Sequence, residues 1–176
     1  VTTILLYFVS EKLHGPASAI RALVLYIFIP SVVLFIPIND SFIALFPLLS
    51  LLILLRSFES KNRLLLSLSG FVFATGIYFS ISLLPLILIF ILLITTKLKF
   101  KAVAITKQLF FFLLGTFIIP VALWVVFKFD SIQMFQILMK GLPESRNYTT
   151  WIFYNLYDFF IFLGIPLAFS FMVLFY

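Results

Sequence analysis

Long apolar runs without charged residues are the feature that most constrains this chain. The stretch from Leu64 to Thr96 contains no Asp, Glu, Lys or Arg. Backbone groups in lipid find no hydrogen-bond partner there, so a membrane-spanning chain must form helices or a closed barrel. Barrel strands alternate apolar and polar residues, whereas a run such as LLPLILIFILLI is apolar on every side. We therefore expect an all-α, polytopic transmembrane helix bundle.

The composition excludes several other classes of protein. Hydrophobic residues make up 64% of the 176 residues and charged residues 10%, whereas soluble domains are roughly 45–50% apolar and about 25% charged. The net charge is +6, but the basic residues fall between the apolar runs, where they are topology signals. We expect no nucleic-acid partner. With no cysteine and the single His14, we also predict no metal site formed by this chain's own ligands.

About 20 apolar residues are needed to cross roughly 30 Å of hydrocarbon. On that scale we expect six to seven membrane segments, some of them short or kinked. They are the end of one span at Thr3–Ser10, then Ala19–Ile36, Ser41–Leu55, Leu64–Phe79, Leu84–Thr96, Ala104–Phe127 and Trp151–Tyr176. We expect residues 1–176 to form a single transmembrane domain, which is an internal fragment of a larger membrane protein.

The apolar block from Leu64 to Thr96 is too long for one crossing. As one helix it would measure about 50 Å, so it would cross only with a steep tilt. Ser80, Ser82 and Pro85 offer a break within it. We therefore predict two short helices joined by a tight turn.

The basic residues then divide unequally between the two sides of the membrane. Nine basic residues lie on one side, in the connections Glu11–Arg21, Arg56–Arg63 and Lys97–Lys107. The other side has three, which are Lys128, Lys140 and Arg146. The nine are Lys12, Arg21, Arg56, Lys61, Arg63, Lys97, Lys99, Lys101 and Lys107. Because basic loops stay in the cytoplasm, we expect a multi-pass protein of the plasma or inner membrane with the Lys97–Lys107 loop cytoplasmic. The Lys128–Thr150 loop is then outside.

The outer loop, residues 128–150, holds a further predicted element. Ile132, Phe135 and Met139 are spaced as one side of a helix, with Gln133 and Gln136 on other sides. This pattern indicates a short helix lying in the outer interface. Such a helix could wall a substrate entrance or act as a plain connector.

Asp40 is one candidate functional residue, at the predicted outer end of two spans. A carboxylate near hydrocarbon is costly and usually has a reason to be there. It could cap the helix that starts at Ser41, or it could bind a sugar hydroxyl or a metal-bridged phosphate. The spacing does not separate these interpretations.

The approach to the last span carries the richest polar cluster. Trp151, Tyr154, Asn155 and Asp158 follow i, i+3, i+4, i+7 spacing and would share one face of a helix. Aromatic rings could pack on a sugar while the amide and carboxylate bind its hydroxyls, and Arg146 could hold a phosphate. An interfacial aromatic belt with an Arg146–Asp158 ion pair is the alternative. The candidate substrate-binding residues are Asp40, Arg146, Tyr148, Trp151, Asn155 and Asp158.

Two regions carry a family resemblance: PIND at Pro37–Asp40 and YNLYDF at Tyr154–Phe159. In these regions and in its run of spans, the chain resembles the C-type integral-membrane glycosyltransferases, which include dolichyl-phosphate-mannose-protein mannosyltransferases. The resemblance implies transfer of a sugar from a polyprenyl-phosphate carrier to an acceptor at the outer face, in contact with membrane lipids and with a divalent cation as an optional cofactor. In this family the catalytic acidic residue, which acts as the general base, lies in the first external loop. This chain has no matching segment, so the resemblance implies that the general base is missing from this fragment.

Two other functions remain open on the sequence. Prolines at 30, 85, 120 and 166 interrupt the spans, as they do in transporters and flippases. Transporters, however, keep ionisable residues at mid-bilayer depth, and this chain has almost none there. A non-catalytic membrane subunit is the second alternative, and it would not need the outer polar cluster.

Overall fold

The described residues form an all-α structure. A computed structural model describes residues 1–30 and 40–140, together with residues 153, 154, 156–158, 161, 164, 169 and 173. Across these residues every regular element is a helix and none is a strand. The predicted all-α class is therefore confirmed.

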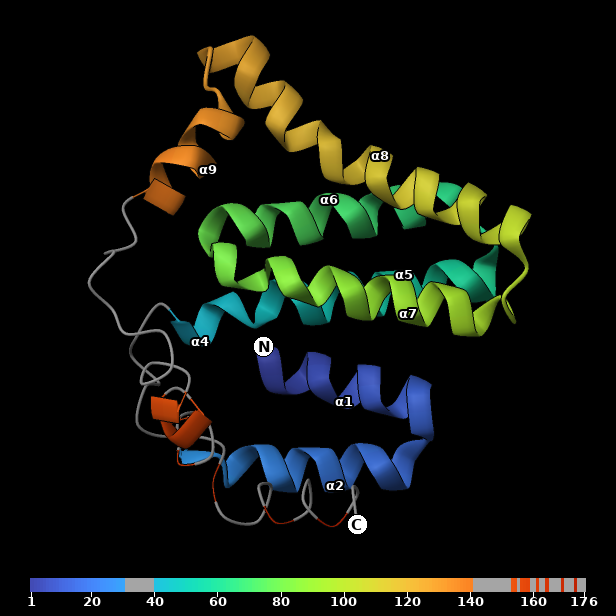
Figure 1. The fold of residues 1–176 in the computed structure, drawn as a ribbon. Helices are drawn as coiled ribbons and strands as arrows, with labels where there is room; N and C mark the ends of the chain where they lie inside the picture. The colour runs from blue at the N-terminus through green and yellow to red at the C-terminus, as the bar shows by residue number, and fades with distance from the viewer. Residues whose placement is uncertain are drawn as a thin grey trace.

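The helices follow the apolar runs closely and lie side by side along much of their length (Figure 1). Their bounds are α1 Thr2–His14, α2 Pro16–Ile27, α4 Asp40–Ile43, α5 Leu45–Ser60, α6 Arg63–Phe79, the 3-10 helix η1 Ile81–Leu86, α7 Ile87–Lys97, α8 Ala102–Phe127 and α9 Ser131–Lys140.

The predicted break in the long apolar block is present. α6 ends at Phe79, and Ser80 takes an extended backbone conformation with φ −153° and ψ 115°. The hydroxyls of Ser80 and Ser82 lie 2.7 Å apart, within hydrogen-bond distance. η1 and α7 then run back beside α6 (Figure 1). Two helices therefore replace the single helix of about 50 Å.

The predicted helix Ala19–Ile36 is wrong as a continuous element. α2 begins earlier, at Pro16, and ends at Ile27. Pro30 explains the early end, because proline donates no backbone hydrogen bond and disfavours helical geometry in the residue before it. The last predicted span, from Trp151 to Tyr176, falls mostly outside the described residues.

Glycines bring α6 and α8 into very close contact. A Cβ atom added at Gly115 would lie 1.8 Å from the Ser67 carbonyl oxygen, and one added at Gly70 would lie 2.0 Å from that of Phe112. Each position therefore admits only glycine. Close approach of backbones at small residues is how helices associate in lipid, where apolar burial gives no driving force.

Serine hydroxyls connect α5 to α6 inside the bundle. Ser50 and Ser69 are both fully buried. The Ser50 hydroxyl donates to the Ser69 carbonyl at 2.8 Å, and the Ser69 hydroxyl donates to the Ser50 carbonyl at 2.9 Å. Ser67 makes a similar bond to α8, donating to the Phe111 carbonyl at 2.9 Å. Small polar residues thus fix three neighbouring helices against one another.

Aromatic packing completes the core of α5 to α8. The ring centroid of Phe90 lies 4.7 Å from that of Phe73 and 5.4 Å from that of Phe112. All three side chains are buried, with Leu54, Leu66 and Ile94 around them. Because the three rings come from α6, α7 and α8, the cluster places the three helices around one centre.

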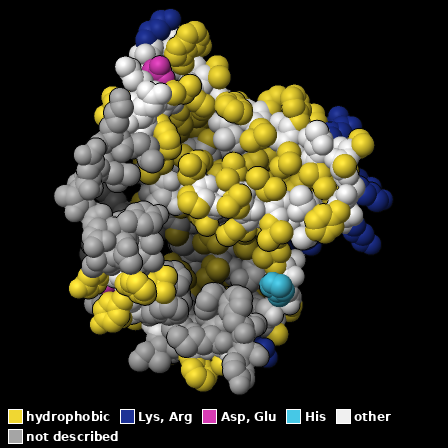
Figure 2. Space-filling view, in the orientation of Figure 1, with side chains coloured by type: hydrophobic (Ala, Val, Ile, Leu, Met, Phe, Trp, Pro, Cys, Tyr) yellow, Lys and Arg dark blue, Asp and Glu magenta, His cyan; other side chains and the backbone are white. Residues whose placement is uncertain are grey.

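The outer surface of these helices is strongly apolar (Figure 2). On α8, Phe117 is 60% exposed and Trp124 59%; on α7, Leu92 is 60% exposed. Within the described residues, α8 is the one helix long and apolar enough to cross a membrane by itself, with 26 residues. Pro16–Ile27, Arg63–Phe79 and Ile81–Lys97 are apolar but shorter.

The basic connections lie together at one end of the helices. The turns after α1, α5 and α7 all lie at the right of Figure 1, and basic side chains gather at that edge in Figure 2. An ion pair ties two of these ends together, because Lys12 Nζ lies 2.6 Å from a carboxylate oxygen of Glu59. These basic connections therefore lie at one end of the helices, as expected if the Leu64–Thr96 block forms two helices and not one.

Candidate functional site

The structure describes only part of the predicted outer-face site. Arg146, Tyr148, Trp151 and Asn155 lie outside the described residues, so their roles stay predictions. Asp40 is the first residue of the short helix α4, and its side chain is also outside the described part. Of the six candidates, Asp158 is the one whose side-chain environment can be followed.

Asp158 lies in a helical stretch with its side chain exposed. Tyr154 precedes it by one turn and therefore shares its helix face. Tyr154 is 65% exposed and Tyr157 63%, and the apolar Phe153 and Leu156 are 70% and 56% exposed. Both residues are helical, and the role predicted for the cluster stays a prediction. Exposed aromatic and apolar side chains close in sequence to an exposed carboxylate are typical of the boundary between lipid and water.

The chain just after Asp158 packs against the end of α2. Gly164 is buried with φ +86°, and a Cβ atom there would lie 2.8 Å from Cδ of Pro30. Its backbone N–H donates to the Ile161 carbonyl at 3.2 Å. This end of α2 is opposite the turn between α1 and α2 that joins the basic end (Figure 1). The packing therefore places Gly164, six residues after Asp158, at the end of α2 away from the turn between α1 and α2.

The helix predicted in residues 128–150 is present as α9. Asp130 begins it, because its Oδ1 accepts from the backbone N–H groups of Ile132 at 2.9 Å and Gln133 at 3.1 Å. The hydroxyls of Tyr78 and Ser131 lie 2.5 Å apart, which ties the start of α9 to the end of α6. Ile132 and Ile137 are 71% and 64% exposed. α9 thus presents apolar side chains outward, as an interfacial helix requires.

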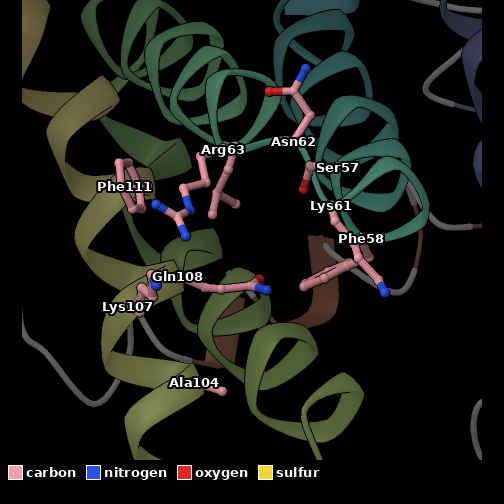
Figure 3. A pocket seen from close by; sticks show the side chains of 10 residues that line it. Ser57, Phe58, Lys61, Asn62, Arg63, Ala104, Lys107, Gln108 and Phe111 are labelled. Atoms are coloured by element: carbon pink, nitrogen blue, oxygen red, sulfur yellow. The ribbon is translucent and has the colours of Figure 1, made fainter.

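Sequence reasoning missed a cavity at the basic end. It has a volume of about 210 Å³ and lies where the end of α5 and the start of α6 meet the first half of α8 (Figure 3). Its lining residues come from two stretches that are far apart in the sequence, Ser57–Leu66 and Ala104–Phe111. The basic residues of those stretches gave a topology signal, but their spacing gave no sign that they meet.

Within the described part of the chain, the cavity is lined by no His, Asp or Glu side chain. Among the described residues, no group of three or more His, Cys, Asp or Glu side chains could hold a metal ion. Two of the described carboxylates have other roles: Glu59 pairs with Lys12, and Asp130 begins α9.

The chain matches no protein-family model, no curated protein and no solved structure. The resemblance to C-type glycosyltransferases therefore rests on the residues of this chain, Pro37–Asp40 and Tyr154–Phe159. Asp158 lies within the second of these regions, in the part of the chain whose exposure the structure describes.

Proposed function

We propose that this chain forms a multi-pass membrane bundle of a C-type glycosyltransferase. The enzyme would transfer a sugar from a polyprenyl-phosphate carrier to an acceptor at the outer face. The observation that carries the proposal is the exposed carboxylate of Asp158, which lies close in sequence to the exposed aromatic residues Phe153, Tyr154 and Tyr157.

The apolar surface supports placement of the bundle in lipid. Large apolar side chains are exposed along α6, α7 and α8, including Leu68, Leu92 and Phe117 at 45%, 60% and 60%. A soluble monomer rarely exposes so continuous an apolar surface. The shorter helices would complete a multi-pass bundle beside α8, since α6 at 17 residues measures about 26 Å.

The distribution of basic residues supports the orientation. The connections that carry most of the lysines and arginines lie at one end of the helices, which the positive-inside rule assigns to the cytoplasm. Asp158 and α9 would then lie on the outer side. Polyprenyl carriers present their sugar at a membrane boundary, and an interfacial α9 would lie beside the entrance for such a substrate.

The residues have distinct roles in the proposed reaction. An acceptor hydroxyl loses its proton to a carboxylate supplied by another part of the enzyme and attacks the anomeric carbon of the sugar. The bond between that carbon and the phosphate oxygen breaks, and the polyprenyl phosphate leaves with the electron pair. Arg146 would stabilise the negative charge on the departing phosphate. Asn155 and Asp158 would bind hydroxyls, while Tyr148, Trp151 and Tyr154 pack on the sugar.

A transporter is the less favoured function. Coupling sites in transporters use ionisable residues near the bilayer midplane. In the described helices, Leu64–Phe79 of α6 and Gln108–Phe127 of α8 contain no Asp, Glu, Lys, Arg or His. Enzyme chemistry at the outer boundary does not need charges at that depth.

Transfer assays on proteoliposomes of the full-length protein test the proposal. The probes are polyprenyl-phosphate mannose and polyprenyl-phosphate glucose, each with a radiolabelled sugar. We expect Arg146→Ala to lower the transfer rate by about 100-fold, the usual effect of removing one group that stabilises a developing anion. Asp158→Asn should also lower the rate strongly, because the amide replaces one acceptor oxygen by a donor.

Asp130→Asn is the matched control. It makes the same chemical change at an exposed carboxylate, and asparagine still begins helices well. It should leave transfer unchanged. Full turnover in both Arg146→Ala and Asp158→Asn would contradict their roles, and solute uptake by vesicles that transfer no sugar would favour the transporter.

A further inference from the structure

The cavity at the basic end of the bundle has the features of an anion site. Three cationic side chains line it, Lys61, Arg63 and Lys107, and its lining contains no acidic residue. The nearby carboxylate of Glu59 on α5 is bound by Lys12 at 2.6 Å. Three cationic residues therefore contribute to the lining of one small volume that no described carboxylate lines.

The Arg63 side chain is held in place by packing. The Arg63 guanidinium lies 5.4 Å from the ring centroid of Phe111, a cation–π contact. Figure 3 shows Arg63 descending from the start of α6 toward Gln108 of α8. The guanidinium is thus oriented toward the cavity, and its planar set of donors suits a phosphate group.

Gln108 provides an observation independent of charge. Its side-chain oxygen Oε1 is buried and has no hydrogen-bond partner among the described residues. Buried polar atoms in folded proteins nearly always have a partner, so an orphan acceptor beside a cavity indicates a missing donor. The phosphodiester group of a phospholipid has no O–H donor of its own. A ligand that carries a hydroxyl next to its phosphate satisfies both Gln108 and the cations.

The start of α6 adds further donors to the same place. The Asn62 side chain accepts from the Leu64 backbone N–H at 2.9 Å, and neighbouring N–H groups of the first turn have no partner within the helix. The positive end of the helix dipole also favours an anion there. Arg63, the first residue of α6, lines the cavity, so this dipole acts on the same volume as the cations.

The size of the cavity and its surroundings narrow the class of ligand. A volume of about 210 Å³ is below the roughly 300–1,000 Å³ of pockets for drug-sized molecules, but it can hold a small headgroup. Leu64 of α6 and Phe110 of α8, each next to a lining residue, are 79% and 60% exposed. Acyl chains could run along this apolar surface while the headgroup occupies the cavity.

We propose that this cavity binds the headgroup of an anionic glycerophospholipid that carries a hydroxyl, such as phosphatidylglycerol. The phosphate lies between Arg63 and Lys107, with Lys61 nearby, and a headgroup hydroxyl donates to Gln108 Oε1. The proposal relies on the membrane placement proposed above and not on sugar transfer. It gives the cytoplasmic end of the bundle a specific lipid site, distinct from the outer-face region of Asp158.

Native mass spectrometry of the full chain in neutral detergent tests the site, because single bound lipids are counted without a charged bilayer. We expect the double variant Arg63→Gln/Lys107→Gln to bind phosphatidylglycerol about tenfold or more weakly, since each lost contact is a charged hydrogen bond. The control Lys97→Gln/Lys99→Gln removes the same charge from exposed residues outside the cavity. It should change binding less than about twofold. Equal losses in the two double variants would overturn the proposal.

The role of Gln108 has its own comparison. Phosphatidylethanol has the charge of phosphatidylglycerol but no headgroup hydroxyl. The native protein should prefer phosphatidylglycerol by about fivefold, the value of one hydrogen bond, and Gln108→Leu should remove that preference. Equal binding of the two lipids by the native protein would overturn the proposed hydroxyl contact.

Soluble competitors distinguish a lipid from a free phosphate. Glycerol 3-phosphate and inorganic phosphate at millimolar concentration should not displace phosphatidylglycerol, because neither has acyl chains to occupy the apolar surface. Displacement by either would identify a soluble phosphate compound as the ligand and overturn the lipid assignment. The sugar-transfer assay reports on the other end of the bundle, so failure of one proposal is distinguishable from failure of the other.

Discussion

Gly115→Val should abolish the stable packing of α6 against α8. A Cβ atom at this position would lie 1.8 Å from the Ser67 carbonyl oxygen and 2.6 Å from its carbonyl carbon. Both are backbone atoms that cannot rotate away, so the helices must separate. We expect the free energy of unfolding to fall by at least about 3 kcal/mol, with the thermal midpoint in detergent lowered by about 10 °C or more. Loss of the monodisperse species in size-exclusion chromatography is the second readout.

Ala122→Val is the matched control for this variant. It also introduces valine on α8, but at an exposed position. Its thermal midpoint should stay within a few degrees of the native value. Gly70→Ala should behave like Gly115→Val, because its Cβ would lie 2.0 Å from the Phe112 carbonyl oxygen. A Gly115→Val protein as stable as Ala122→Val would show that α6 and α8 do not meet at these glycines.

The second large effect concerns charges on the exposed face of α8. Leu114 and Val121 are 46% and 55% exposed; Leu114 lies in the middle of the helix, and Val121 lies six residues before its end. On a soluble surface, Leu114→Arg/Val121→Arg would be tolerated. In a bilayer each arginine near the centre costs about 2.5–3.5 kcal/mol on insertion scales. We therefore expect this double variant to lose most of its membrane-integrated fraction, measured as full-length chain that remains in membranes after alkaline extraction.

The same two charges at the ends of α8 provide the comparison. Val103 and Phe127 are 85% and 73% exposed and lie one residue inside the start and at the last residue of the helix. Arginine near a helix end reaches the interface with its long side chain, so Val103→Arg/Phe127→Arg should remain integrated. Equal integration of the two double variants would place the middle of α8 outside the hydrocarbon.

The helices were predictable because the sequence carries strong local signals. Charged residues end the apolar runs at Arg63 and Lys97, and Ser80 with Pro85 divides the run between them, so α6 and α7 appear close to their expected bounds. Asp130 similarly marks the start of α9. The error at α2 has a local cause as well, because Pro30 outweighs the apolar run that continues past it.

Contacts between helices were not predictable in the same way. Gly70 and Gly115 are ordinary glycines in the sequence, and only the crossing of α6 and α8 makes each of them irreplaceable. The cavity likewise needs Arg63 and Gln108 to meet across two helices. Spacing along one helix shows which residues share a face, but it carries no information on which helix that face contacts. Spacing along the chain therefore predicts that Tyr154 and Asp158 share a helix face, but it does not predict the cavity.

The most direct test of the account is the sidedness of the two ends of the bundle. The native chain has no cysteine, so single cysteines can be introduced at the exposed residues Ser60 and Lys97 at the basic end, and Ser82 and Gln133 at the other. A membrane-impermeant maleimide applied to intact cells should label cysteines at 82 and 133, and should label those at 60 and 97 only after permeabilisation. Labelling of all four from one side, or of 60 and 97 on intact cells, would contradict a membrane-spanning bundle with its basic end in the cytoplasm.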